Sequence, residues 1–159
     1  MTKLELVQKL VGALRAERDT ADRLARETAN AANHPEARPE NDKDTRKLEL
    51  SYLAQGQAAR ATELESIITA LLSQPPRAFQ PDEAIALGAL VVLESADKVE
   101  RVLFCSGGGG TSVEDEHGAV RIVTPEAPLG RALFGKTVGE EIELVVAGRK
   151  RELTIVSVA

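Results

Sequence analysis

The stretch SQPPRAFQPDE, residues 73–83, separates two parts of the chain that have different hydrophobic periods. Before it, apolar and small residues recur in alternating steps of three and four, which is typical of a helix with one buried face. After it, short β-branched runs alternate with turn residues, which is typical of strands. Its three prolines remove backbone donors and favour an extended chain. The sequence therefore predicts an α+β protein with domains at 1–74 and 84–159, joined by a linker at 75–83.

The first part predicts two helices, over residues 3–33 and 42–73, because it is rich in Ala, Leu, Arg and Glu. The expected buried seam of the first helix is Leu4, Val7, Val11, Leu14, Arg18, Ala21, Ala25, Thr28 and Ala32. The expected seam of the second is Leu50, Leu53, Gln57, Arg60, Leu64, Ile67 and Leu71. Asn41 or Asp42 is the expected N-cap of the second helix.

The two helices have nearly equal lengths of roughly 30 residues, or about 45 Å. A short link between helices of equal length favours an antiparallel hairpin, a coiled coil in which each seam covers the other. A dimeric coiled coil, with seams paired between chains, is the alternative. We expect the monomer because the link is short.

The turn of this hairpin is acidic. HPEARPENDKDTR, residues 34–46, carries the carboxylates of Glu36, Glu40, Asp42 and Asp44. In one interpretation the turn is a solvated loop, and Asp42 and Asp44 stabilise the N-terminus of the following helix through its dipole. An acidic tip also suits capture by a positively charged surface of a protein partner.

Composition excludes several functional classes. The net charge of −5 and the 3% aromatic content argue against a protein that wraps nucleic acid or stacks its bases. One cysteine, Cys105, and two histidines, His34 and His117, argue against a disulfide framework and against a structural zinc site. The chain has no run of 18 apolar residues and no signal-peptide pattern, so we expect a cytoplasmic protein without a membrane partner.

The second part predicts a small antiparallel sheet of four to six strands that curls over one short helix. The expected strands are residues 89–95, 99–106, 119–124, 141–147 and 151–158. The expected helix is PLGRALFG, residues 128–135.

The stretch TPEAPLGRALFGKTVGEEIELVV, residues 124–146, resembles the signature of the bacterial transcript-cleavage and elongation factor family GreA/GreB. The matching residues are Pro125, Pro128, Leu129, Gly130, Ala132, Leu133, Gly135, Lys136, Gly139 and Glu140. SYLAQGQAARATELESII, residues 51–68, is similar to the family's return helix, which contains Gln-Gly. The resemblance implies a helical hairpin followed by an FKBP-like domain.

The resemblance also implies a mode of action. In the family, the hairpin enters the secondary channel of RNA polymerase, and its acidic tip helps hold a catalytic Mg²⁺ beside the 3′ end of backtracked RNA. The polymerase then cleaves the RNA, so a protein of this kind is not an enzyme and binds no cofactor alone. The implied tip acids and Mg²⁺ ligands are Asp42 and Asp44, with Glu40 as a further candidate. The implied contacts with the polymerase rim are Leu129, Arg131 and Phe134.

The tip departs from the family pattern, in which an Asp and a Glu form the catalytic pair. Counting back from Gln55-Gly56 places Asn41 at the Asp and Asp44 at the Glu, and a shift of one residue supplies Asp42 instead. The alternative function is therefore a secondary-channel binder that inhibits or modulates the polymerase without supporting cleavage.

Overall fold

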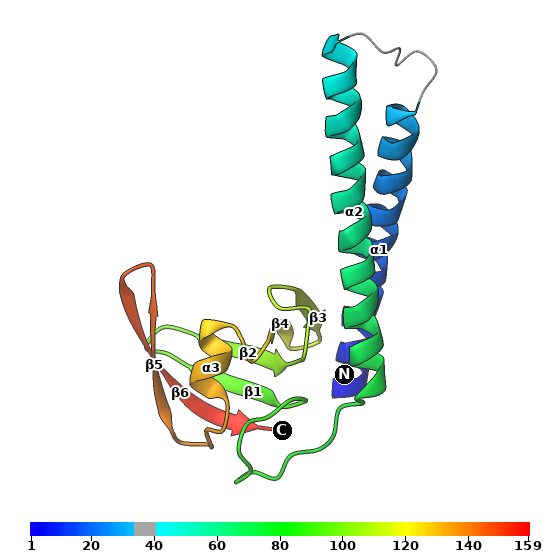
Figure 1. Cartoon of the computed structure of the whole chain (residues 1–159). Coiled ribbons are helices and arrows are strands. Elements are labelled where there is room, and N and C mark those ends of the chain that lie inside the picture. Colours follow the sequence, from blue (N-terminus) through cyan, green and yellow to red (C-terminus); the bar gives the residue numbers. More distant parts are fainter. Residues whose placement is uncertain (34–40) are drawn as a thin grey trace. The chain divides into compact units, whose positions relative to one another are not determined.

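The computed structural model describes residues 1–33 and 41–159, and for residues 41–43 it describes only the backbone. The helices are α1 (Lys3–Ala32), α2 (Asn41–Ser73) and α3 (Pro128–Leu133). The strands are β1 (Leu90–Glu94), β2 (Val99–Phe104), β3 (Ser112–Asp115), β4 (Gly118–Val123), β5 (Glu141–Val146) and β6 (Arg149–Val158) (Figure 1). The bounds of α1 and α2 agree with the predicted helices to within one residue. In the described part of the chain, neither long helix has an apolar stretch that would cross a membrane.

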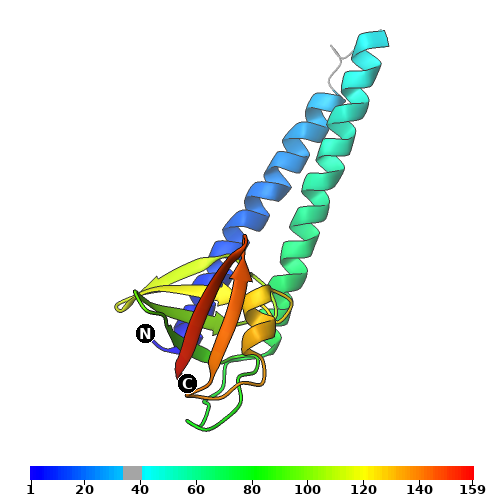
Figure 2. The same cartoon turned by 90° about the vertical axis from the view of Figure 1, so that its left-hand side faces the viewer.

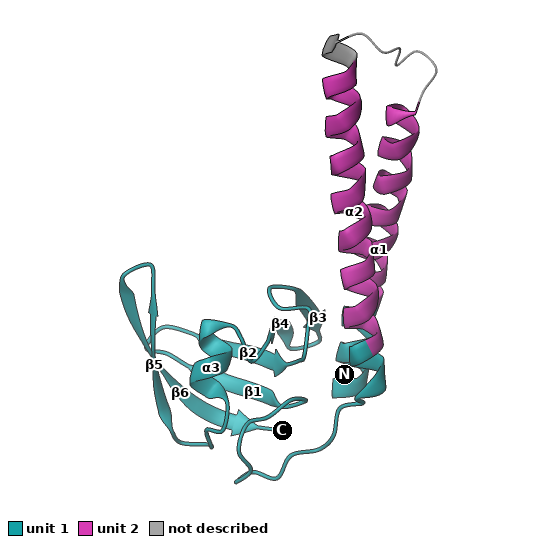
Figure 3. Ribbon diagram, viewed as in Figure 1, with its two compact units in different colours: residues 1–11, 70–159 teal, residues 12–69 magenta. Residues whose placement is uncertain are grey.

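Internal contacts divide the described chain into two compact units (Figure 3). Unit 2, residues 12–69, contains most of the hairpin. Unit 1, residues 1–11 and 70–159, contains the sheet, α3, the start of α1 and the end of α2. The predicted domain boundaries at 74/75 and 83/84 stay predictions.

Within unit 2, α1 and α2 lie side by side as an antiparallel hairpin (Figures 1 and 2). Its seam contains Leu14, Ala25 and Ala32 on α1, and Ala54, Leu64 and Ile68 on α2, all of them buried. Arg60 Nη2 contacts Glu17 Oε1 across the helices at 2.8 Å, and Arg18 pairs with Glu65. These ion pairs lie at the surface, where water screens the attraction, so the apolar seam contributes more to the stability of the hairpin than they do.

Within unit 1, the described strands form one six-stranded sheet in the order β3-β4-β2-β1-β6-β5. The pairings are antiparallel except that of β2 with β4, which is parallel with Val102 opposite Arg121. The sheet therefore confirms the predicted fold class, and it adds one parallel pair and a strand, β3, that the pattern does not predict. Figure 2 shows the sheet with α3 packed against it.

The main core lies between the sheet and α3. It includes Val91 and Leu93 of β1, Phe104 of β2 and Leu133 of α3, all fully buried. Phe79, which belongs to the predicted linker, is also part of this core and is 8% exposed. Lys3 Nζ lies 4.9 Å from the centroid of the Phe79 ring, and Arg77 Cζ lies 3.8 Å from it. The segment at 75–83 therefore belongs to unit 1 and contributes Phe79 to its core.

The start of α1 is also part of unit 1. Lys3 Nζ donates to the carbonyl oxygens of Gly88 at 3.0 Å and Ala159 at 2.9 Å, and it contacts the carbonyl of Arg77. Partial burial, above all, lowers the pKa of Lys3 below its ordinary value. These contacts tie the first turn of α1 to the end of β6 and to the loop before β1.

Candidate functional site

The stretch at 124–140, on which the resemblance rests, builds the connection between β4 and β5. Leu129 is 6% exposed and Leu133 is fully buried, so both hold α3 against the sheet. Gly130 lies between them, and a Cβ atom there would stand 1.8 Å from Thr124 O. The first turn of α3 therefore packs directly on the backbone of residue 124, an approach that only glycine allows.

The end of this stretch is a structured turn. Gly135 and Gly139 have φ values of +79° and +90°, which favour glycine. Glu140 Oε2 accepts hydrogen bonds from Thr137 N at 2.6 Å and from Thr137 Oγ1 at 3.2 Å. The backbone bond from Thr137, above all, lowers the pKa of Glu140 below its ordinary value. The Glu140 carboxylate thus stabilises this turn. The sequence analysis does not predict this role, although a glutamate three residues after a threonine is a known signal for such a hydrogen bond.

The residues of the stretch that remain at the surface are candidates for contact with a partner. Arg131 and Phe134 are exposed, and 53% of Phe134 is accessible. Phe134 packs its ring 6.1 Å from that of Phe104, centroid to centroid, so its position is fixed by the core. Leu129 lies in the core rather than on this surface. Polymerase contact through Leu129, Arg131 and Phe134 stays a prediction.

The predicted tip acids are described only in part. Glu40 lies outside the described residues. Asp42 lies in the first turn of α2, and its side chain is outside the described part. Asp44 is exposed, also near the start of α2, where a carboxylate interacts favourably with the positive end of the helix dipole. Where side chains are described, no group of three or more His, Cys, Asp or Glu residues is placed to hold a metal ion.

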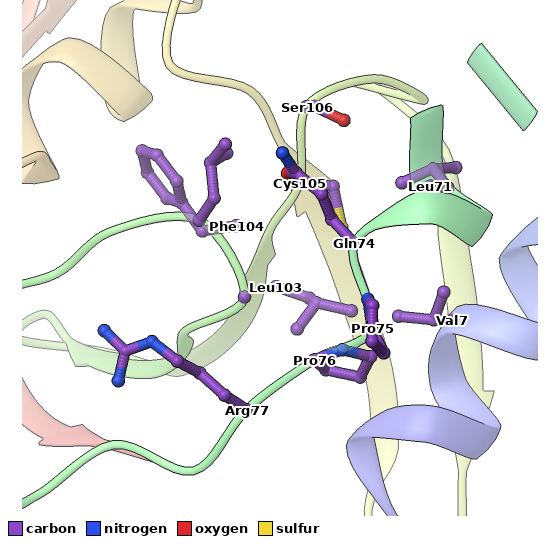
Figure 4. A pocket seen from close by; sticks show the side chains of 12 residues that line it. Val7, Leu71, Gln74, Pro75, Pro76, Arg77, Leu103, Phe104, Cys105 and Ser106 are labelled. Carbon is purple, nitrogen blue, oxygen red and sulfur yellow. The ribbon is translucent and has the colours of Figure 1, made fainter. Parts of the chain in front are cut away.

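Cys105 lines a small cavity of about 100 Å³ within unit 1 (Figure 4). Val7 of α1, Leu71 of α2, and Pro75 and Pro76 of the following segment line the same cavity. Burial raises the pKa of the Cys105 thiol to about 12. The thiol therefore stays protonated near neutral pH and is not a candidate nucleophile.

Comparisons with known proteins agree with the sequence resemblance. The family model described as "Transcription elongation factor, GreA/GreB, C-term" matches residues 80–159. A protein of Halorhodospira halophila named transcription elongation factor GreA is 25% identical over 144 residues, which cover 91% of this chain and 86% of that protein. A protein of Sulfurovum with the same name is 31% identical over 97 residues, which cover 61% of this chain and 57% of that protein.

Solved structures with similarity to the chain include GreA factor homolog 1 (Gfh1) of Thermus thermophilus, which is 22% identical with a TM-score of 0.40. The similarity covers 96% of this chain and 94% of that one. Another is a GreA/GreB elongation factor of Nitrosomonas europaea, which is 19% identical with a TM-score of 0.38. That similarity covers 60% of this chain and 78% of the other.

Proposed function

The chain belongs to the GreA/GreB family of transcription elongation factors, and on this basis we propose that it binds bacterial RNA polymerase and inserts its hairpin into the secondary channel. There it stimulates the polymerase's own cleavage of backtracked RNA. It acts as a cytoplasmic monomer and is not an enzyme by itself, because the cleaved RNA and the main catalytic site belong to its partner.

The observation that carries this proposal is the exposure of Asp44 near the start of α2. The hairpin consists of two paired helices, and α2 alone has 33 residues, or about 50 Å. Such an element can carry a carboxylate deep into another protein. The position of Asp44 at the described end of the hairpin supports a role in which its oxygen atoms act at a distant site.

The residues at this end fit a cation that another protein mainly holds. Mg²⁺ prefers hard oxygen ligands, keeps several waters and is bound by few carboxylates. Asp42 and Asp44, with Glu40 as a further candidate, would supply one or two oxygen ligands. A bound Mg²⁺ would polarise the scissile phosphate and stabilise charge on the reacting oxygens. The role of this chain is to carry its carboxylates to the polymerase site and to orient water there.

The sheet unit would dock at the rim of the channel through the exposed Arg131 and Phe134. Leu129 would support that surface indirectly, since it anchors α3 in the core.

The test is an assay on stalled, backtracked polymerase. Wild-type protein is expected to shorten the RNA from its 3′ end, and the pair of changes Asp42→Asn and Asp44→Asn should reduce the rate about tenfold or more, which corresponds to at least about 1.4 kcal/mol of transition-state stabilisation. Asp22→Asn is the matched control, because Asp22 is exposed on α1 and pairs with Arg26. Persistence of cleavage in the double variant would contradict the assignment of the acids.

A second function is favoured by one observation, the presence of Asn41 where the family pattern has an acid. An amide is a weaker ligand for Mg²⁺ than a carboxylate. If the wild-type protein leaves the RNA intact but slows nucleotide addition, the chain is a channel binder that inhibits or modulates the polymerase.

A further inference from the structure

A groove of about 420 Å³ lies on one face of unit 2, and both helices form its walls. It is lined by Ala21 and Leu24 of α1 and by Tyr52, Leu53, Gly56 and Gln57 of α2, and we call it the hairpin groove. Tyr52 is 64% exposed, Leu53 52% and Leu24 37%. In this part of the hairpin the seam buries the small side chains of Ala25 and Ala54. The larger apolar side chains next to them in the sequence remain exposed. Apolar side chains gathered on one exposed face make this groove a candidate interaction surface.

Gly56 is the second observation. It lies inside the 33-residue helix α2, where glycine is less favourable than alanine. A Cβ atom at this position would meet nothing within 4 Å, so no contact inside the described chain requires glycine. A surface that approaches the backbone of α2 closely at this point would require it.

Gln57 is the third observation. Its Oε1 atom is buried and accepts no hydrogen bond from the residues that the structure describes. A buried acceptor without a donor is unfavourable. Gln57 lines the groove, so an occupant that turns this side chain outward would supply the missing donor.

The charged residues of the groove restrict the chemistry of that occupant. Glu17 and Arg60 also line the groove and contact each other at 2.8 Å, so the charges within it compensate one another. The complementary surface is therefore apolar and without excess charge, and it presents one hydrogen-bond donor. Tyr52 lies eight residues after Asp44 along α2, or about 12 Å. A hairpin inserted far enough to use Asp44 would take the groove into its partner as well.

We propose that the hairpin groove docks an apolar segment of the secondary-channel wall of RNA polymerase, which packs over Gly56 and donates a hydrogen bond to Gln57 Oε1. The proposal rests on the proposed function. It states that the groove provides the affinity with which the hairpin binds the channel. The acids at the tip then act on the RNA, and the groove holds them there.

The experiment compares Gly56→Ala and Gly56→Leu with Gly12→Ala. Gly12 is the matched control because it also lies inside a helix, where an added Cβ atom would meet nothing within 4 Å, and it is not part of the groove. Both alanine variants should unfold at higher denaturant concentration than the wild type. Only the Gly56 variants should bind polymerase more weakly, by roughly tenfold for Gly56→Leu.

Wild-type affinity in both Gly56 variants would overturn the proposal. A Gly56→Leu variant that changes the sedimentation of the protein alone, with unchanged polymerase binding, would overturn it in favour of a second copy of this chain as the occupant. Failure of the wild-type protein to bind polymerase would refute the proposed function itself, and that result is distinguishable because it needs no variant.

Discussion

Gly130→Ala should destabilise unit 1 more than the same substitution at Gly135 or Gly139, the other two glycines of the family signature. The new Cβ atom would stand 1.8 Å from Thr124 O, 2.8 Å from Thr124 C and 3.2 Å from Pro125 Cα. Thr124 O is held in place because it also accepts a hydrogen bond from Ala127 N at 3.2 Å. An ordinary contact begins at 3.4 Å, so α3 must move away from this carbonyl by more than 1 Å.

The cost follows from what α3 carries. Overpacking of this kind costs about 1–3 kcal/mol, and the displacement also loosens Leu129 and Leu133, whose burial is worth about 1.5–3 kcal/mol each. Partial loss of that packing brings the expected total to about 3–4 kcal/mol. For a chain of this length the melting temperature should fall by roughly 10 °C.

Guanidinium unfolding followed by far-ultraviolet circular dichroism measures this change. Gly12→Ala is the control, because the same methyl group there meets open space and should stabilise α1 by about 0.5–1 kcal/mol. A loss below about 1 kcal/mol in Gly130→Ala would refute the close packing of α3 on residue 124.

Three further outcomes are expected. Ala147 has a φ of +53° in the turn between β5 and β6, so Ala147→Asn should raise the free energy of unfolding by about 0.5–1 kcal/mol in the same titration, and a loss of stability would contradict the strain assigned to this turn. Arg101 donates to both carboxylate oxygens of Asp115 at 2.7 and 2.8 Å and lowers the pKa of Asp115 below its ordinary value. The pair therefore stabilises the fold above about pH 4 and ceases to do so as the pH falls through the lowered pKa. Unfolding measured from pH 7 to pH 2 should show wild type and Asp115→Asn converging in acid, and a constant difference would argue against the pair. The Cys105 thiol, whose pKa is raised to about 12, should react with iodoacetamide at pH 8 on the order of 1000-fold more slowly in the folded protein than in urea. Mass spectrometry measures both rates, and equal rates would show that the thiol is accessible.

Strands with strong β-branched runs could be predicted from the sequence, because residues such as Val91, Val102 and Ile155 are buried in the sheet. Strand β3 could not. Of its four residues only Val113 is buried, two are acidic, and the strand lies at the edge of the sheet, so its pairing with β4 leaves little trace in hydropathy. The parallel pairing of β2 with β4 depends on contacts between distant segments, which a local pattern does not contain.

The seams of the hairpin were predictable in period but not in every position. The prediction that Leu4 is buried is wrong, since it is 50% exposed, whereas Leu6 and Leu10 are fully buried. The start of α1 belongs to the same unit as the sheet, so its apolar residues have the sheet as well as α2 for partners. The prediction assumed one seam that faces α2 alone. The predictions that Leu53 and Arg60 lie in the seam are also wrong. Ala54 is buried instead of Leu53, because two helices approach most closely where the side chains between them are small.

The candidate site shows a similar limit. The acidic turn and the family signature can both be recognised in the sequence, and the role of Asp44 as a tip acid stays a prediction. The pattern does not distinguish residues that face a partner from residues that form a turn, because both recur at fixed spacings. The hairpin groove has no sequence signal except an isolated helical glycine, Gly56, beside large apolar residues.

The close contact between α3 and residue 124 has a consequence for anyone who searches other genomes with this signature. Gly130, Gly135, Gly139 and Glu140 are needed to shape a corner of the chain, whatever that corner touches. A homologue could therefore keep all four and have lost every contact with the transcription machinery. These four residues would then show common ancestry but not present function. Evidence for function would have to come from Arg131, Phe134 and the hairpin.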